Sequence, residues 1–339
     1  MQWKGSVYKL IWPDLMLWLS LYYCLSFTYR FALDEDQKRQ VFLLGGGADG
    51  GLLFEKVVLY CDEFNDLIPV SFLLGFFVSE IIRRWWNMWE LLPWPDSVAL
   101  FVSTSLRGQD ERGRVMRRTI VRYINLAIVH SMTRFSVRVK KRFPTLDHLV
   151  AAGFMTENEK VIFDEMINVR KMQKLYWMPC VWAASVVTRA RKEGRIKDDQ
   201  ALKTILDHIN TVRALCGKCH HINIINIPLV YPQVVSIAVY AFFLSCLMGR
   251  QFLDPSKNYP HHTLDLIVPF FTIFQFMFYM GWLKVAETLI NPFGEDDDDF
   301  ELNWLIDRHI KVSFIAVIAI VTFLATATCG DSSVTVDTE

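Results

Sequence analysis

The sequence predicts an all-α, multi-pass membrane protein with a large helical body outside the membrane. The chain has 339 residues, 52% hydrophobic and 21% charged, with a mean hydropathy of +0.23. An average soluble domain is about 45–50% apolar, even with glycine counted, and about 25% charged. The apolar residues also form uncharged runs that match membrane-crossing helices in length. Together these observations exclude an ordinary soluble enzyme and a disordered chain.

Four membrane spans are expected, at about 10–33, 67–84, 225–249 and 264–290. Residues 15–29 are uncharged, and residues 222–249 and 266–283 contain neither charged residues nor histidine. The uncharged run at 67–79 is shorter, and a fifth uncharged run follows at 312–330. A helix that crosses about 30 Å of hydrocarbon needs roughly 20 apolar residues. A soluble core helix would explain any one run, but several in one chain favour a membrane protein.

The distribution of charge predicts the orientation of the chain. Residues 104–221 contain 23 Lys and Arg against 11 Asp and Glu, whereas residues 34–66 contain three basic residues against eight acids. Cytoplasmic segments near span ends are enriched in Lys and Arg. Both termini and a helical body at about 85–222 and 291–317 are therefore expected in the cytosol, with loops 34–66 and 250–263 outside. The net charge of zero gives no support for nucleic-acid binding.

Five consecutive acids, residues 295–299, form the strongest local signal. Neighbouring carboxylates repel one another, and a hard divalent cation relieves the repulsion. Ca²⁺ takes 6–8 oxygen ligands from carboxylates and from backbone carbonyls, although the spacing of an EF-hand is absent. A solvated acidic patch explains the run equally well. The aromatic residues Phe293, Phe300 and Trp304 indicate that the run is held on a surface.

A second signal lies at the start of the second expected span. Ile68, Phe72 and Phe76 are spaced i, i+4 and i+8, so on a helix they form one stripe. Pro69 suits the first turn of that helix. On composition alone, a packing stripe is favoured over the lining of a pore.

The remaining motifs do not indicate an enzyme. Cys216, Cys219 and His220 match the C-x-x-C-H pattern of covalent haem attachment. They lie on the expected cytosolic side, however, and a second ligand pair for zinc is not evident. Residues near a helix end are the favoured interpretation, and a membrane redox enzyme is a low-ranked alternative. The glycine-rich residues 44–51 lack the ending of a P-loop and predict a flexible loop.

Taken together, these pieces resemble the bestrophin family of Ca²⁺-activated anion channels. The resemblance covers about 3–40 and 54–317 in family order. The acidic string is highly specific. The matching strings include 3–9, 67–72, 92–96, 227–231, 249–253, 281–286 and 291–300.

The resemblance implies a pore. Bestrophins are homopentamers around one central pore in the plasma membrane, and they pass Cl⁻ and other small anions. The second membrane helix lines a narrow apolar neck, at positions that match Ile68, Phe72 and Phe76 here. The resemblance therefore reverses the preference for a packing stripe. The family's second, cytosolic aperture matches Gln200, where the family has a small apolar residue. A Cl⁻ and bicarbonate channel in the lipid bilayer is expected.

The resemblance also implies a cofactor, Ca²⁺, held in a cytosolic clasp. Matched position by position, the side-chain ligands are Asp296 and Asp299. The backbone ligands are the carbonyl groups of Asn291 and Thr288. The rest of the acidic cluster supports the site, namely Glu295, Asp297 and Asp298.

The chain also departs from the family pattern. We expect a single channel domain over about 1–317, whose match begins at Trp3, without the family's preceding segment. Residues 40–53 form a glycine-rich insertion in an outside loop. Residues 318–339 form an atypical hydrophobic tail where the family has a polar segment. These departures favour one alternative function, a membrane interaction or regulatory subunit that does not itself conduct.

Overall fold

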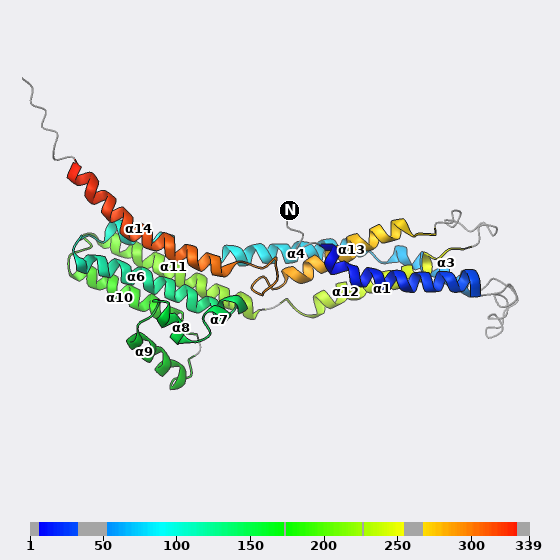
Figure 1. Ribbon diagram of the computed structural model, residues 1–339, viewed down its shortest axis with the longest axis horizontal. Helices are drawn as coiled ribbons and strands as arrows, with labels where there is room; N and C mark the ends of the chain where they lie inside the picture. Colours follow the sequence, from blue (N-terminus) through cyan, green and yellow to red (C-terminus); the bar gives the residue numbers. More distant parts are fainter. Residues whose placement is uncertain (1–6, 33–52, 173, 226, 254–266, 331–339) are drawn as a thin grey trace, which may run out of the picture. The chain divides into compact units, whose positions relative to one another are not determined.

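The structure, a computed structural model, describes residues 7–32, 53–172, 174–225, 227–253 and 267–330. These residues form helices and connecting turns, with no strand among them (Figure 1). The prediction of an all-α fold is therefore confirmed. The chain divides into two compact units: Met1–Trp85 with Ile227–Asn291, and Trp86–Asn226 with Pro292–Glu339.

The first unit is a bundle of long apolar helices. In it α1 packs along α13, and α12 packs along α3 (Figure 1). The indole Nε1 of Trp18 donates to the carbonyl of Phe243 at 2.9 Å, and the Tyr22 hydroxyl donates to the carbonyl of Arg250 at 2.8 Å. Both bonds fasten α1 to α12 and its C-terminal cap. The elements are α1 (Val7–Phe27), the π-helical η2 (Thr28–Ala32), α3 (Leu53–Leu67), most of α4 (Val70–Glu90), α12 (Val230–Gly249) and α13 (Phe270–Leu289).

One glycine explains how closely α12 and α3 approach. A Cβ atom on Gly249 would lie 2.8 Å from the backbone nitrogen of Asp62 and 3.0 Å from the Asn65 side chain. Real Cβ atoms do not come that close to a backbone atom. The last residue of α12 therefore has to lack a side chain for the two helices to meet there.

Two helices are long and apolar enough to cross a membrane, Tyr8–Phe31 and Val230–Gly249. They lie where spans are expected at 10–33 and 225–249. A third candidate arises if Lys56–Asn65 and Val70–Glu90, bent by 41° at the break between them, count as one span. The second helix of that pair covers most of the span expected at 67–84.

The span expected at 264–290 corresponds in position to α13, which is not among the membrane-span candidates in the described part of the chain. Its last turns contain Lys284 and Glu287, which lower its hydropathy. The loop expected at 34–66 also needs correction, because its second half forms helix α3. Residues 40–52 of the expected insertion lie outside the described residues.

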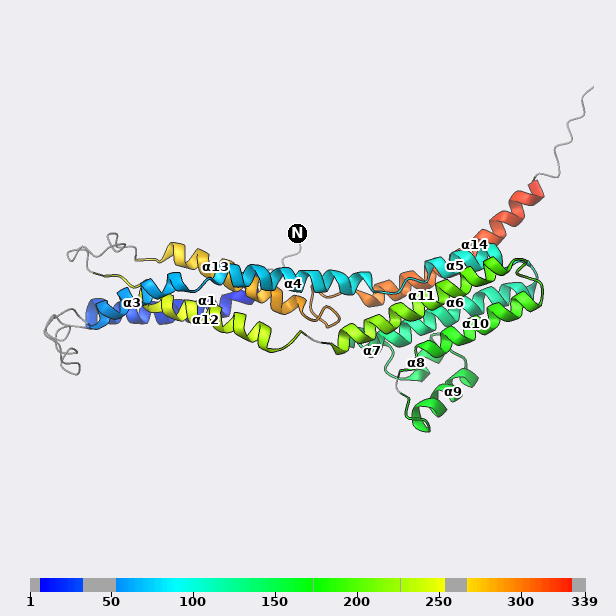
Figure 2. The same cartoon turned by 180° about the vertical axis from the view of Figure 1, so that it is seen from behind.

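The second unit is a body of helices around α6. Helix α6 packs against α10 and α14, and α11 packs against α5, α6 and α10 (Figure 2). The Asn125 amide donates to the Ser313 hydroxyl at 3.0 Å, which joins the buried face of α6 to α14. The elements are α5 (Asp96–Ser105), α6 (Glu111–Met132), α7 (Val137–Arg142), α8 (Leu146–Ala151), α9 (Glu157–Asn168), α10 (Trp177–Lys192), α11 (Asp199–Ile224) and α14 (Leu302–Gly330).

The last helix extends past the expected domain end. Helix α14 continues without a break through residue 317 to Gly330. The backbone of 318–330 therefore prolongs a helix of the second unit. Residues 331–339 of the expected tail lie outside the described residues.

Candidate functional site

Helix α4 has one face in the core of the first unit and one exposed face. Val70, Leu74 and Phe77 are fully or almost fully buried, as is Ile81 one turn later. Phe72 and Phe76 project from the opposite side and are 63% and 58% exposed. Their rings touch edge to face, with centroids 4.7 Å apart. A period of 3.6 residues places positions 72 and 76 on one side and positions 70, 74, 77 and 81 on the other.

Ile68 precedes the helix. Its carbonyl accepts from the Val70 N–H at 2.8 Å, and the first helical bond runs from the Leu73 N–H to the Pro69 carbonyl at 3.1 Å. Ile68 is half-buried and packs against the core of the first unit. The expected stripe is therefore helical at Phe72 and Phe76 only, and Ile68 lies in the turn before it. The neck assignment itself stays a prediction.

The acidic residues lie in a tight turn that two phenylalanines anchor. Phe293 and Phe300 are 2% and 6% exposed, and their ring centroids lie 5.6 Å apart. The N–H of Phe300 donates to the Pro292 carbonyl at 2.9 Å and closes the turn. The expectation that aromatic residues hold the run agrees with these two contacts. Trp304 differs, because it is 63% exposed.

Asp299 is the one buried carboxylate of the five. It accepts from the Asp296 N–H at 2.8 Å, and its own N–H donates to the Asp296 carbonyl at 3.1 Å. Burial raises the pKa of Asp299, and the negative charges of Asp296 and Asp298 raise it further. A cation next to this carboxylate would offset both the cost of burying its charge and the repulsion from its acidic neighbours.

Helix α7 supplies positive charge to the acidic turn. The Arg138 Nη2 donates to the carbonyls of Glu295 and Asp296 at 2.9 and 2.7 Å, and its Nη1 donates to the Glu301 carboxylate at 2.5 Å. Lys141 forms an ion pair with Glu295. Sequence reasoning missed these contacts, because more than 150 residues separate the partners. The one feature of the sequence that could have indicated these contacts is the concentration of basic residues at 138–142.

The expected Ca²⁺ ligands belong to both units. Thr288 and Asn291 are in the first unit, and Asp296 and Asp299 are in the second. Carboxylate and carbonyl oxygens are the donors that Ca²⁺ prefers, and a buried carboxylate with a raised pKa fits such an ion. No cluster of three or more metal-binding side chains occurs among the described residues. The two carboxylates alone are thus an incomplete ligand set, and Ca²⁺ binding stays a prediction.

Gln200 is exposed in the first turn of α11. Asp198 caps this helix by accepting from the Ala201 N–H at 3.3 Å, and the Gln200 carbonyl accepts from the Thr204 hydroxyl at 2.9 Å. The Gln200 side chain is therefore on the surface of the second unit in a single chain. Its assignment to a cytosolic aperture stays a prediction.

The cysteines of the C-x-x-C-H motif are buried in α11. Cys216 and Cys219 are 0% and 1% exposed, and the Cys219 thiol donates to the Leu91 carbonyl at 3.2 Å. Burial raises the pKa of Cys219 to about 12, so it stays a thiol at neutral pH. The Nε2 of His220 lies 3.3 Å from the Ser131 hydroxyl oxygen. These contacts describe packing inside the helical body.

Long apolar helices joined to a helical body define an all-helical membrane protein. The chain belongs to the bestrophin family, since the family model described as "Bestrophin, RFP-TM, chloride channel" matches residues 1–319. The resemblance inferred from the sequence strings is therefore confirmed.

Two curated relatives and one solved structure illustrate the similarity. The chain is 53% identical to mouse Bestrophin-2 over 315 residues, which are 93% of this chain and 59% of that protein. It is 50% identical to human Bestrophin-1 over 315 residues, 93% of this chain and 51% of that protein. The chain thus spans little more than half the length of these relatives. A bacterial bestrophin homologue from Klebsiella pneumoniae has a similar fold, with a TM-score of 0.61 and 18% identity over 93% of this chain and 99% of that chain.

Proposed function

We propose that this chain is a subunit of a homopentameric anion channel that cytosolic Ca²⁺ opens. It crosses the plasma membrane several times with both termini in the cytosol, and it passes Cl⁻ and bicarbonate. Family membership and 53% identity to mouse Bestrophin-2 support the proposal.

The observation that carries the proposal is the exposed aromatic pair on α4. Phe72 and Phe76 are more than half exposed, while the other face of the same helix is packed into the core. Neighbouring large aromatic side chains that are exposed on a single chain usually mark a contact with another molecule or a functional surface. In a ring of five copies they face a shared axis and form stacked apolar rings. Such a constriction gates by dewetting, and the positive ring edges of phenylalanine favour weakly hydrated anions.

The acidic turn is the proposed sensor. Asp299 is a buried carboxylate among like charges, and bound Ca²⁺ would supply the opposite charge there. Arg138 already occupies the carbonyls of Glu295 and Asp296, so the ion would use other oxygens, including Asp296 and Asp299 carboxylates. An ion that binds one conformation of the turn more tightly shifts the population toward that conformation.

Reconstitution tests the conducting function directly. The purified chain is inserted into liposomes, and Cl⁻ efflux is measured with and without Ca²⁺ on the side of the cytosolic body. Efflux that requires Ca²⁺ is expected. The absence of efflux under both conditions would contradict the proposal and favour a non-conducting membrane interaction subunit.

A conservative pair of variants tests the sensor. Asp299→Asn keeps an oxygen that accepts from the Asp296 N–H but removes the charge, so the turn is retained. We expect the Ca²⁺ concentration for half-maximal efflux to rise about tenfold, since one charged ligand is lost. Asp164→Asn in α9 removes a carboxylate away from the turn and serves as the matched control. Equal dose–response curves for the two variants would count against the clasp.

A further inference from the structure

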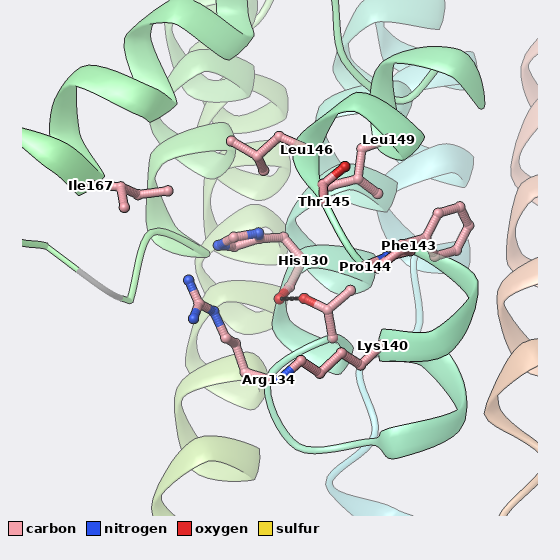
Figure 3. Close-up of a pocket in the computed structure, with 10 residues that line it drawn as sticks. His130, Arg134, Lys140, Phe143, Pro144, Thr145, Leu146, Leu149 and Ile167 are labelled. Carbon is pink, nitrogen blue, oxygen red and sulfur yellow. Dashed lines mark hydrogen bonds between the residues drawn. The ribbon is translucent and has the colours of Figure 1, made fainter.

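The second unit contains a cavity of about 270 Å³ that the Ca²⁺ and pore assignments do not involve (Figure 3). It lies where the end of α6 meets α7, α8 and α9. Its wall combines cationic and hydroxyl groups with aliphatic side chains. The lining residues used below are His130, Arg134, Lys140, Leu146, Leu149 and Ile167.

His130 is a buried polar side chain that points into this cavity. Figure 3 shows its ring directed into the space between Arg134, Leu146 and Ile167. The residue is 4% exposed, and its Nε2 has no hydrogen-bond partner in the described part of the chain. A buried nitrogen without a partner loses its hydration without compensation, and most such atoms in native proteins are satisfied. The unpartnered nitrogen is therefore a candidate hydrogen-bonding group for a ligand in this cavity.

The ring is held in place and is neutral. It packs edge-on against Phe163, with centroids 5.3 Å apart. Burial, together with the positive charge of Arg134 and the nearby His220, lowers the pKa of His130 to about 3. At neutral pH the imidazole can therefore donate a hydrogen bond from Nε2 without adding a charge.

The two cations of the cavity form no ion pair within the described part of the chain. Neither Arg134 nor Lys140 makes an ion pair with any described carboxylate, whereas Arg138, Lys141 and Arg142 on the same stretch of chain each pair with an acid. The cavity is therefore electrically unbalanced toward positive charge. Arg134 and Lys140 both line the cavity. Their positive charges attract an anionic group, and the guanidinium fork matches a carboxylate in geometry.

Apart from the hydroxyl groups of Thr133 and Thr145, the rest of the wall is apolar. Leu146 and Leu149 of α8 and Ile167 of α9 line the cavity together with Phe143. The volume lies below the roughly 300–1,000 Å³ of pockets for drug-sized ligands, so only a small molecule fits. A fully hydrated inorganic anion would leave the aliphatic wall without a partner. A short hydrocarbon chain next to the charged group satisfies both parts of the wall.

We propose that this cavity binds a small aliphatic monocarboxylate from the cytosol. Its carboxylate contacts Arg134 and Lys140 and accepts from the Nε2–H of His130. Its hydrocarbon chain lies against Leu146, Leu149 and Ile167. The site does not depend on the proposed channel function, because none of its residues is assigned to the pore or to the Ca²⁺ site.

Butyrate is the probe for this proposal. Binding to the purified full chain is measured by ligand-observed NMR without Ca²⁺, so the result is independent of ion flux. We expect saturable binding of butyrate and no saturable binding of butyramide, which has the same size but no charge. Equal binding of the two compounds, or none of either, would overturn the proposal. Tighter binding of inorganic phosphate than of butyrate would overturn the assignment to a carboxylate.

Three variants locate the site. Arg134→Gln removes a charge-assisted hydrogen bond and is expected to weaken butyrate binding about tenfold or more. His130→Leu keeps the approximate volume and removes Nε2, with an expected loss of about fivefold. Arg118→Gln changes an exposed arginine elsewhere on α6 and is expected to leave binding unchanged. Since Arg134 is exposed, its variant decides the question even if His130→Leu does not fold. Equal affinities for Arg134→Gln and Arg118→Gln would refute the site.

Discussion

The attachment of α9 to α6 depends on one half-buried carboxylate, Glu159. Its two oxygens accept from the Arg122 guanidinium at 2.7 and 2.8 Å, from the Tyr123 hydroxyl at 2.7 Å and from the Thr156 N–H at 2.9 Å. The Glu159 and Arg122 side chains are 13% and 19% exposed. Glu159 also completes the capping box that begins α9. Because α9 contributes Ile167 to the cavity wall, this pair holds one side of the proposed ligand site.

The perturbation is Glu159→Gln, which keeps the shape and removes the charge. Burial by itself raises the pKa of Glu159, but the Arg122, Thr156 and Tyr123 donors outweigh it and lower the pKa from 4.5 to about 2. Lowering the pKa by this much corresponds to roughly 3 kcal/mol. Water still reaches part of the pair, so we expect α9 to lose about 2–3 kcal/mol of stability against local opening.

Hydrogen exchange measures this opening. Amides of 157–168 in the variant are expected to exchange about 30- to 150-fold faster than in the wild type, while those of α10 change little. Glu157→Gln, in the exposed first turn of the same helix, is the matched control. Exchange in α9 that differs less than about threefold between the two variants would refute the reasoning.

The stabilisation that the Glu159–Arg122 ion pair provides depends on pH. Since the folded-state pKa of Glu159 lies below its ordinary value, the stabilisation is fully present above about pH 4.5 and disappears as the pH falls toward about 2. The stability difference between wild type and Glu159→Gln, followed by circular dichroism, should shrink across this window. If the stability difference between the two proteins stays constant from about pH 4.5 to 2, the stabilisation does not come from the charge of Glu159.

Three further outcomes are expected. In patch clamp, alanine at Ile68, Phe72 and Phe76 together should leave the current nearly independent of Ca²⁺, because the apolar rings would be gone; intact gating would exclude this neck. Gln200→Leu replaces an exposed amide with an apolar side chain and should shift the relative permeability of Cl⁻ and bicarbonate, measured from reversal potentials; unchanged potentials would remove Gln200 from the aperture. Arg138→Gln removes contacts to Glu301 and to two carbonyls of the acidic turn, and it should move half-maximal Ca²⁺ activation several-fold. An unmoved curve would show that the turn is positioned without this arginine.

Much of the fold follows from local patterns. Uncharged runs at 15–29 and 222–249 predict helices because a chain in hydrocarbon must satisfy its own backbone groups, and α1 and α12 lie there. Helix α3 escaped prediction because 53–67 mixes acids with apolar residues and lies next to an insertion. Its placement follows from packing against α12, where Gly249 permits a close approach. The residues of α3 contain no local pattern that predicts its contact with α12.

The sequence by itself determined the helical class, the family and the turn that contains the acids. These properties depend on local composition, on the 3.6-residue period and on strings of neighbouring residues. Tertiary structure alone decided that Asp299 is the buried acid among five, and that Phe72 and Phe76 are exposed while Phe77 is buried. It also paired Arg138 with the acidic turn. Burial and pairing depend on groups that lie far apart in the chain, so only the packed chain determines them.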